Sequence, residues 1–254
     1  MIVGGDCLQL DVGNSGAKWR LVKADGSVAG RGRYQTDDVA SREALLGCSQ
    51  ALAQIWVASV ADAEKNAALA SLLRERWGVE PWFPRSESQT GDLINSYSDP
   101  ARMGVDRWLA MLAGRARYQG SLCVVDAGSA LTIDLVAANG RHEGGYIIPG
   151  AQLMERALLL DTDRVRFAEE PDYAITPGHS TAHAVRHGIA RAQAGALLLA
   201  LDRAAAGSSG GVAPQLLFCG GGGEMLQALV ARGGVVVPDL VFEGLEVMHS
   251  LSQQ

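Results

Sequence analysis

The sequence predicts an α/β fold that is built twice, as two related domains that each hold a mixed β-sheet with helices on both faces. An apolar strand runs into Asp11-Val12-Gly13-Asn14-Ser15, and much the same series returns at Asp126-Ala127-Gly128-Ser129, close to half a chain later. A second strand follows each turn, and alternating helical and strand-like segments follow in both halves. A later strand enters four consecutive glycines, Gly220 to Gly223.

The first half begins as a strand meander and continues as alternating helices and strands. Short apolar or alternating runs punctuated by glycine predict the strands, and alanine, leucine and glutamate predict the helices, the second of which stops at Gly78. The predicted elements are strands 7–12, 18–24 and 28–34, a helix 41–53, a strand 55–59, a helix 63–76, an extended piece 81–84, a polar loop 85–104 and a helix 105–118.

The second half repeats this plan. Its predicted elements are strands 122–126, 131–137 and 144–148, a helix from about 151, a long alanine-rich helix 180–206, a strand 215–219, a helix 224–231, a strand 234–237 and a final helix 243–251. The repeat places the domain boundary near 119–121. We therefore expect an N-terminal domain over 1–120 and a C-terminal domain over 121–254.

Each of the two turns has the chemistry of a phosphate-binding hairpin. An Asp closes a buried strand, and we expect the following glycine, Gly13 or Gly128, to reverse the chain with a positive φ. Backbone N–H groups exposed by such a turn can hold phosphate oxygens. Either turn alone is also an ordinary hairpin, because turn chemistry favours the same residues. Turn chemistry does not require the repetition, which suggests a nucleotide held between two related domains.

The glycine loop at Gly220–Gly223 supports the same interpretation. Glycines between a buried strand and a helix allow the backbone to approach a ligand closely. The position of Lys18 excludes a Walker-type loop, and no G-x-G-x-x-G fingerprint follows a first strand.

The composition of the chain restricts the partners that it is expected to bind and the cellular compartment in which it is expected. The formal charge is −6, and Lys and Arg are not clustered, so we expect no nucleic-acid partner. The four cysteines have no C-x-x-C spacing and are expected to be reduced thiols. No apolar run approaches the roughly 18–20 residues that span a bilayer, and no basic leader is present. We expect a cytoplasmic protein that does not enter membranes.

A third group of polar residues stands where the helix 105–118 begins. Gly104 lets the backbone come close, Asp106 lies in the first helical turn, and Arg107 places a cation beside it. Asp106 can be a simple helix cap. Beside Arg107, it can instead be a proton acceptor while Arg107 binds an anionic ligand.

Four blocks in this order resemble the motif set of type III pantothenate kinases. They are Asp11-Val12-Gly13-Asn14-Ser15, Gly104-Val105-Asp106-Arg107, Asp126-Ala127-Gly128-Ser129-Ala130 and Gly144-Gly145-Tyr146-Ile147-Ile148-Pro149-Gly150. The resemblance implies two ribonuclease-H-like domains of the actin-like ATPase superfamily. It also implies ATP-dependent phosphorylation of pantothenate to 4′-phosphopantothenate, the first step of coenzyme A biosynthesis, with Mg²⁺ and a monovalent cation, K⁺ or NH₄⁺, as cofactors.

The resemblance also implies roles for single residues. Asp106 is similar to the family's catalytic base, and Asp126 to the residue that holds the monovalent cation. Ser129 is similar to an ATP-contacting hydroxyl, although the family usually has Thr there. ATP would also contact Asp11, Val12, Gly13, Asn14, Ser15, Gly16, Ala17 and Lys18. Pantothenate would contact Tyr97, Gly104, Val105, Asp106, Arg107 and Thr181, the last across the interface of a homodimer.

Other interpretations of the sequence are weaker. His179, His183 and His187 share a helix face, but no Cys or carboxylate lies at ligand spacing, so a packed or solvated face is favoured over a zinc site. Among functions, the alternatives are another small-molecule kinase of the superfamily and a nucleotide-binding regulator or accessory protein without turnover. Retention of Asp106 and Asp126 argues against the regulator.

Overall fold

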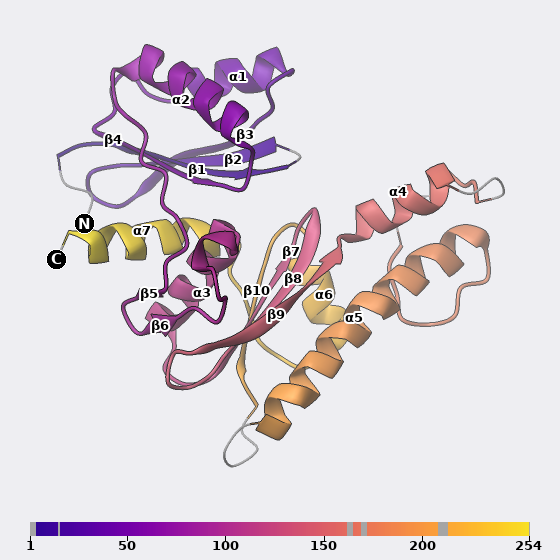
Figure 1. Ribbon diagram of the computed structural model, residues 1–254. Helices are drawn as coiled ribbons and strands as arrows, with labels where there is room; N and C mark the ends of the chain where they lie inside the picture. Colours follow the sequence, from indigo (N-terminus) through magenta and orange to yellow (C-terminus); the bar gives the residue numbers. More distant parts are fainter. Residues whose placement is uncertain (1–3, 15, 162–164, 169–171, 208–212, 254) are drawn as a thin grey trace. The chain divides into compact units, whose positions relative to one another are not determined.

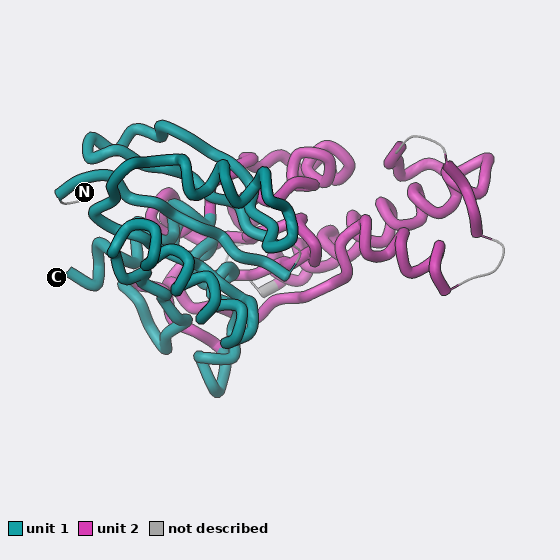
Figure 2. Tube along the Cα trace, turned by 90° about the horizontal axis from the view of Figure 1, so that it is seen from above, with its two compact units in different colours: residues 1–91, 97–113, 241–254 teal, residues 92–96, 114–240 magenta. Residues whose placement is uncertain are grey.

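The computed structural model describes residues 4–14, 16–161, 165–168, 172–207 and 213–253. The chain divides into two compact units, coloured separately in Figure 2. Unit 1 comprises Met1–Gly91, Tyr97–Ala113 and Val241–Gln254, and unit 2 comprises Asp92–Ser96 and Gly114–Leu240.

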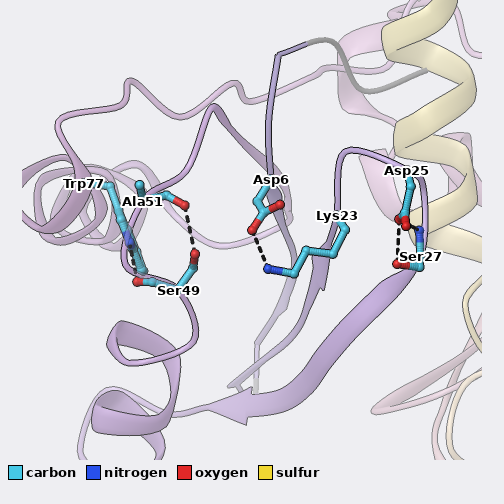
Figure 3. Close-up of polar contacts among 7 residues, drawn as sticks. All are labelled: Asp6, Lys23, Asp25, Ser27, Ser49, Ala51 and Trp77. Carbon is cyan, nitrogen blue, oxygen red and sulfur yellow. Dashed lines mark hydrogen bonds and ion pairs between the residues drawn. The ribbon is translucent and has the colours of Figure 1, made fainter.

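A four-stranded mixed sheet forms the base of unit 1. Its strands are β1 (Cys7–Gly13), β2 (Gly16–Val22), β3 (Val28–Tyr34) and β4 (Gln54–Ser59), in the spatial order β3-β2-β1-β4. The first three run antiparallel, and β4 runs parallel to β1. An ion pair of 2.7 Å between Asp6 and Lys23 ties the start of β1 to the end of β2 (Figure 3). The strands predicted at 7–12, 18–24, 28–34 and 55–59 are confirmed.

Helices cover both faces of this sheet (Figure 1). On one face lie α1 (Val39–Leu46) and α2 (Ala63–Trp77), and the apolar cluster beneath them joins strand residues such as Leu8 and Leu10 to Leu45 and Leu73. The C-terminal helix α7 (Leu240–Ser252) lies on the other face. The helix α3 (Val105–Arg117) follows the polar loop as predicted.

Two predicted segments of the first half differ in detail. The helix predicted over 41–53 ends at Leu46, where the Gly47 N–H donates to the carbonyls of Glu43 and Leu45. Side chains of α2 bind the chain beyond it, because Trp77 Nε1 donates to the carbonyl of Ser49 at 3.1 Å (Figure 3). The loop 85–104 holds three short elements: β5 (Gln89–Thr90), β6 (Leu93–Ile94) and the 3₁₀ helix η1 (Pro100–Arg102).

The sheet of unit 2 repeats the pairing of unit 1 and adds one strand. Its strands are β7 (Leu122–Ala127), β8 (Ala130–Val136), β9 (His142–Pro149), β10 (Gln215–Cys219) and β11 (Val235–Val236), in the order β11-β10-β7-β8-β9. Strands β7, β8 and β9 are again an antiparallel meander, and β10 runs parallel to β7 as β4 does to β1. The counterpart of β11 in unit 1 is a single parallel bridge between Trp56 and Trp82. The duplication inferred from the two turns is therefore present in the strand pairing.

In the described part of unit 2, the helices that lie wholly within it are α4 (Ala151–Asp161), α5 (Thr181–Gly207) and α6 (Gly223–Val230). Residues of α5 and α6 such as Leu197 and Leu226 form an apolar core with Cys123, Val125 and Ile133 of the sheet. A partly buried ion pair of 3.0 Å between Arg186 of α5 and Glu155 of α4 joins the two longer helices. No helix within the described ranges is long and apolar enough to cross a membrane.

The two compact units do not divide at 119–121, where the sequence predicts the domain boundary. The division falls inside α3, after Ala113, and the C-terminal segment from Val241 belongs to unit 1. Close backbone packing explains both. A side chain at Gly244 of α7 would collide with the backbone of Leu109, whereas a side chain at Gly114 would press on Leu122 and Leu217 of unit 2. The helix α3 thus contributes to both units, and the C-terminal segment belongs to unit 1.

All four cysteines are free thiols. Cys7, Cys123 and Cys219 are buried, and Cys48 is half-buried. Burial raises the pKa of the Cys123 thiol to about 12, with a smaller contribution from the nearby Asp134 carboxylate, and burial also raises the pKa of Cys7. These thiols stay protonated near neutral pH and serve as small core side chains.

A partly buried polar network joins α7 to the sheet of unit 1. Arg20 is only 5% exposed, and its Nη2 donates to Glu246 at 2.7 Å while its Nε donates to Gln9 Oε1 at 2.7 Å. Gln9 Nε2 donates to the same Glu246 carboxylate at 3.2 Å. The guanidinium also lies 4.9 Å from the ring centroid of Phe242. A buried cation thus has its anion supplied from the far end of the chain.

Replacing Glu246 with Gln is expected to destabilise the protein by about 1–3 kcal/mol, because the buried Arg20 loses its charged acceptor. The free energy of unfolding in urea measures the effect, with Glu75→Gln on the exposed side of α2 as the matched control. Equal stability of the two variants would show that this network does not hold α7.

Candidate active site

The first Asp-bearing turn is a two-residue hairpin loop. Asp11 lies opposite Lys18 in the β1/β2 register, and Gly13 lies opposite Gly16. Ser15, one of the residues predicted to contact ATP, lies outside the described residues. The prediction of a positive φ at Gly13 is wrong. Among the described residues of this turn, the positive value occurs at Gly16, with φ of 139°.

The two faces of this hairpin have different surroundings. Leu8 and Leu10 face the core under α1 and α2, so period-two alternation turns Gln9 and Asp11 to the side of α7. On the side of α1 and α2, the turn borders a cavity of about 580 Å³. Its lining includes the turn residues Val12, Gly13, Asn14, Gly16 and Ala17 and the polar residues Gln35, Thr36, Asp37, Asp38, Arg42 and Lys65.

The second Asp-bearing turn is enclosed by glycine backbone. A side chain at Gly220 would collide with Asp126 Oδ1 and with the carbonyl of Ala127, and one at Gly150 would collide with the carbonyls of Gly128 and Ser129. The Gly150 N–H donates to the Ser129 carbonyl at 3.0 Å. Backbone from two other segments therefore reaches the turn because those segments end in glycine.

The expected positive φ at Gly128 is also wrong. Within the described residues, the positive value near this turn belongs to Gly220, at 76°. The Gly128 N–H donates to the carbonyl of Ala130 at 2.9 Å, within a loop that is one residue longer than the first, because three residues separate the paired Ala127 and Leu131. Asp126 lies on the sheet face opposite the core residues Cys123 and Val125, as Asp11 does in unit 1.

The start of α3 fixes the orientation of Asp106. The Arg107 N–H donates to Asp106 Oδ1 at 2.8 Å, so the carboxylate folds back over the first helical turn. A Cβ at Gly104 would lie 2.5 Å from the same oxygen. Upstream, Ser86 Oγ donates to the carbonyl of Met103 at 2.9 Å and anchors the approach to the helix. The glycine is therefore needed for this carboxylate orientation.

Arg107 and Tyr97, both predicted to bind substrate, contact each other. Arg107 is only 5% exposed, and its Nη1 donates to the Tyr97 hydroxyl at 2.9 Å. The guanidinium carbon lies 5.8 Å from the centroid of the Tyr97 ring. A guanidinium held in this way is a preorganised site for a carboxylate.

Thr181 is the first residue of α5 and is exposed. Ser180 caps this helix, because its Oγ accepts the His183 N–H at 3.1 Å. Further along the helix, His183 and His187 stack with ring centroids 5.2 Å apart, and His187 Nδ1 contacts the Thr176 carbonyl at 2.8 Å. In the described part of the chain, no group of three or more His, Cys, Asp or Glu side chains is placed to hold a metal ion.

One buried polar pair of unit 2 is not among the candidate site residues of the sequence. His142 Nε2 lies 3.0 Å from Asp134 Oδ1, and both residues are at most 1% exposed. The charged residue in the middle of the apolar strand predicted at 131–137 is the signal for it, because a buried carboxylate needs a partner. The partner itself could not be identified from spacing.

Comparison with known proteins places this geometry in a family. Residues 7–202 match the family described as type III pantothenate kinase. A type III pantothenate kinase of Marinobacter nauticus is 40% identical over 247 residues, covering 96% of this chain and 98% of that protein. One of Cellvibrio japonicus is 36% identical over 247 residues, with coverage of 96% and 97%.

Solved structures confirm the predicted fold class. A Campylobacter jejuni protein named for the Baf family of transcriptional activators has a TM-score of 0.61 at 20% identity, covering 97% of this chain and all of that one. The activator of the 2-hydroxyisocaproyl-CoA dehydratase from Clostridium difficile, solved with bound ADPNP, has a TM-score of 0.53 at 11% identity, with coverage of 98% and 96%. At these identities the likeness concerns the fold alone. The full-length relatives and the matched family establish that this chain belongs to the type III pantothenate kinases.

Proposed function

We propose that this protein transfers the γ-phosphate of ATP to the primary hydroxyl of pantothenate, giving 4′-phosphopantothenate in the first step of coenzyme A biosynthesis. The observation that carries the proposal is membership of the type III pantothenate kinase family over nearly the whole chain. The two Asp-bearing turns and the Asp106–Arg107 group are the matching chemistry within the chain.

Asp106 is the proposed general base, which accepts the proton of the attacking hydroxyl. The backbone N–H of Arg107 holds one of its oxygens, and Gly104 leaves room for that orientation. Arg107 and Tyr97 bind the pantothenate carboxylate, because a guanidinium in a fixed orientation suits a planar anion. Val105 completes the substrate surface at the start of α3.

The residues of the two turns are proposed to hold ATP. Backbone N–H groups suit phosphate oxygens, and Ser129 offers an exposed hydroxyl on the second turn. The first turn contributes Asp11, Val12, Gly13, Asn14, Ser15, Gly16, Ala17 and Lys18. Since phosphoryl transfer needs little covalent help, positioning and electrostatics supply most of the acceleration.

Two cations are part of the proposal. The Asp126 carboxylate and the neighbouring carbonyls of the second turn are oxygen donors, which suit a hard monovalent cation, K⁺ or NH₄⁺. Mg²⁺, with Asp11 near it, would neutralise charge on the transferred phosphoryl group. Asp11 and Asp126 each end a strand on the face opposite the apolar core of their own sheet.

The proposed setting is a cytoplasmic homodimer without a nucleic-acid or membrane partner. The net charge of −6 supports the first exclusion. Thr181, exposed at the start of α5, is proposed to contact pantothenate bound to the other subunit.

Pantothenate-dependent consumption of ATP by the purified protein tests the function. A panel of other small alcohols, offered in place of pantothenate, tests whether the chain is a different kinase of the same fold. A protein that binds ATP but turns over none of these substrates would be a regulator instead.

Asp106→Asn should lower kcat by roughly 10²–10⁴ and leave ATP binding intact, because it removes a positioned general base. Steady-state kinetics and nucleotide titration measure both effects. Asp99→Asn is the matched control, since Asn retains the oxygen that caps η1. Turnover by Asp106→Asn at the wild-type rate would leave helix capping as the role of this carboxylate.

A second variant tests the same carboxylate without removing it. Gly104→Ala places a methyl group 2.5 Å from Asp106 Oδ1 and should lower kcat while the thermal midpoint changes little. Gly188→Ala in α5 is the control, because a Cβ there meets no atom within 4 Å.

Activity should require a monovalent cation, because Asp126 and the adjacent carbonyls form a site suited to one. Rates in K⁺, Na⁺ and Tris at constant ionic strength separate a bound ion from general screening. Asp126→Ala should lose whatever K⁺ response the wild-type protein has. Equal wild-type rates in the three salts would remove the cation from the mechanism.

Two inactive variants should restore activity when their subunits exchange. A dimer of one Asp106→Ala and one Thr181→Arg chain contains one intact shared site, so random exchange recovers about a quarter of wild-type activity. Fluorescence energy transfer between labelled subunits verifies the exchange. A mixture that exchanges but stays inactive would show that each site is complete within one chain.

A further inference from the structure

Three side chains of unit 2 form a chain of hydrogen bonds that ends next to Tyr97. Ser96 Oγ lies 2.9 Å from His142 Nδ1, and His142 Nε2 lies 3.0 Å from Asp134 Oδ1. A carboxylate only accepts, so Asp134 partners an N–H at His142 Nε2, and the Ser96 hydroxyl, which can donate or accept, partners Nδ1. The arrangement orients each group in turn.

A β-bulge in β9, rather than regular strand pairing, brings His142 to this position. Leu135 lies opposite Gly144, but Val136 lies opposite His142, so β9 carries one extra residue, Glu143. Without this bulge, His142 would share the core face with Leu135. Gly144 has a φ of 110°, which a glycine tolerates. The bulge therefore turns His142 to the face that carries Asp134.

Because Asp134 and His142 are buried, the pair destabilises the fold unless both side chains make hydrogen bonds. His142 is fully buried and Asp134 is 1% exposed, whereas Ser96 is exposed. A buried carboxylate and imidazole without hydrogen bonds would cost more than apolar side chains of the same size. The pair thus offers a fixed hydrogen-bond partner, His142 Nδ1, to the hydroxyl of Ser96 on a surface loop.

The same loop has two further anchors on the β8–β9 hairpin. The Ile94 N–H donates to the Gly140 carbonyl at 3.0 Å, and Ile94 forms a parallel bridge with Arg141. A side chain at Gly140 would collide with the carbonyl of Asp92. The segment Asp92–Ser96 is therefore fixed to unit 2 up to the residue before Tyr97, whose hydroxyl accepts from Arg107.

We propose that Asp134, His142 and Ser96 are a positioning relay that fixes Tyr97 for binding of the pantothenate carboxylate. None of the three is a catalytic residue in this proposal, since each acts through the conformation of the loop. Because the proposal deepens the function proposed above, its test needs one arm that depends on pantothenate and one that does not.

The kinetic arm compares Ser96→Ala with Ser96→Thr and Ser98→Ala. Loss of one hydrogen bond should raise the KM for pantothenate about five- to tenfold in Ser96→Ala, with kcat and the KM for ATP within about twofold. Ser96→Thr keeps the hydroxyl and should restore the wild-type KM. Ser98→Ala is the matched control in the same loop. A fall in kcat with an unchanged KM for pantothenate would overturn the relay.

The second arm does not depend on the substrate. Amide hydrogen exchange in a peptide covering residues 92–99 should be faster in Ser96→Ala and in Asp134→Asn than in the wild-type protein or in Ser98→Ala. Unchanged exchange in Ser96→Ala would overturn the relay even if pantothenate were not the substrate. Because Ser96 is exposed, Ser96→Ala is expected to fold, so the test stays valid even if Asp134→Asn does not fold.

A third outcome addresses the resemblance of Ser96, His142 and Asp134 to a hydrolytic triad, in which the serine is a nucleophile. Wild-type protein should not release p-nitrophenol from p-nitrophenyl acetate faster than Ser96→Ala. A serine-dependent burst of p-nitrophenol would assign Ser96 as a nucleophile and overturn the positioning role.

Discussion

The candidate site depends on the alternation of strand residues between the two faces of each sheet, one of which packs on the apolar core. Successive strand residues point to opposite faces, so strands that bury Leu8 and Leu10, or Cys123 and Val125, must turn the residues between them to the other face. Asp11 and Asp126 are such residues, at the strand ends where the chain reverses. The apolar core therefore determines the face on which the proposed phosphate-binding chemistry stands, and the duplicated pairing produces it twice.

Glycine controls how closely other segments approach these carboxylates. Gly220 and Gly150 allow backbone to contact the second turn, and Gly104 leaves space for the Asp106 carboxylate. In each case a methyl group would collide with an oxygen of the site. The glycines at the tips of the two turns, Gly13 and Gly128, do not have this role, because a Cβ on either would meet only ordinary contacts beyond 3.5 Å.

Buried polar networks connect segments that are distant in sequence. Arg20 and Gln9 hold Glu246 from the C-terminal helix, and Asp134 with His142 holds the loop before Tyr97. Such networks are costly when incomplete, so each specifies one arrangement of its segments. The second network bonds the loop residue before Tyr97 to a strand pair, so the start of this loop segment has a fixed position.

Local sequence determined most of the secondary structure and the two turns, because period-two alternation, glycine stops and the repeated Asp-x-Gly series act over a few residues. It also identified Tyr97, Asp106 and Arg107 as one group, through their resemblance to a family motif. Only the tertiary structure decided where the first helix ends, at Leu46, and that the residues from Val241 onward pack with the first unit. It also decided that a bulge at Glu143 turns His142 toward Asp134. The end of the first helix and the packing of the C-terminal segment depend on contacts between residues far apart in the chain, and the bulge depends on strand pairing, whose free energies no local pattern records.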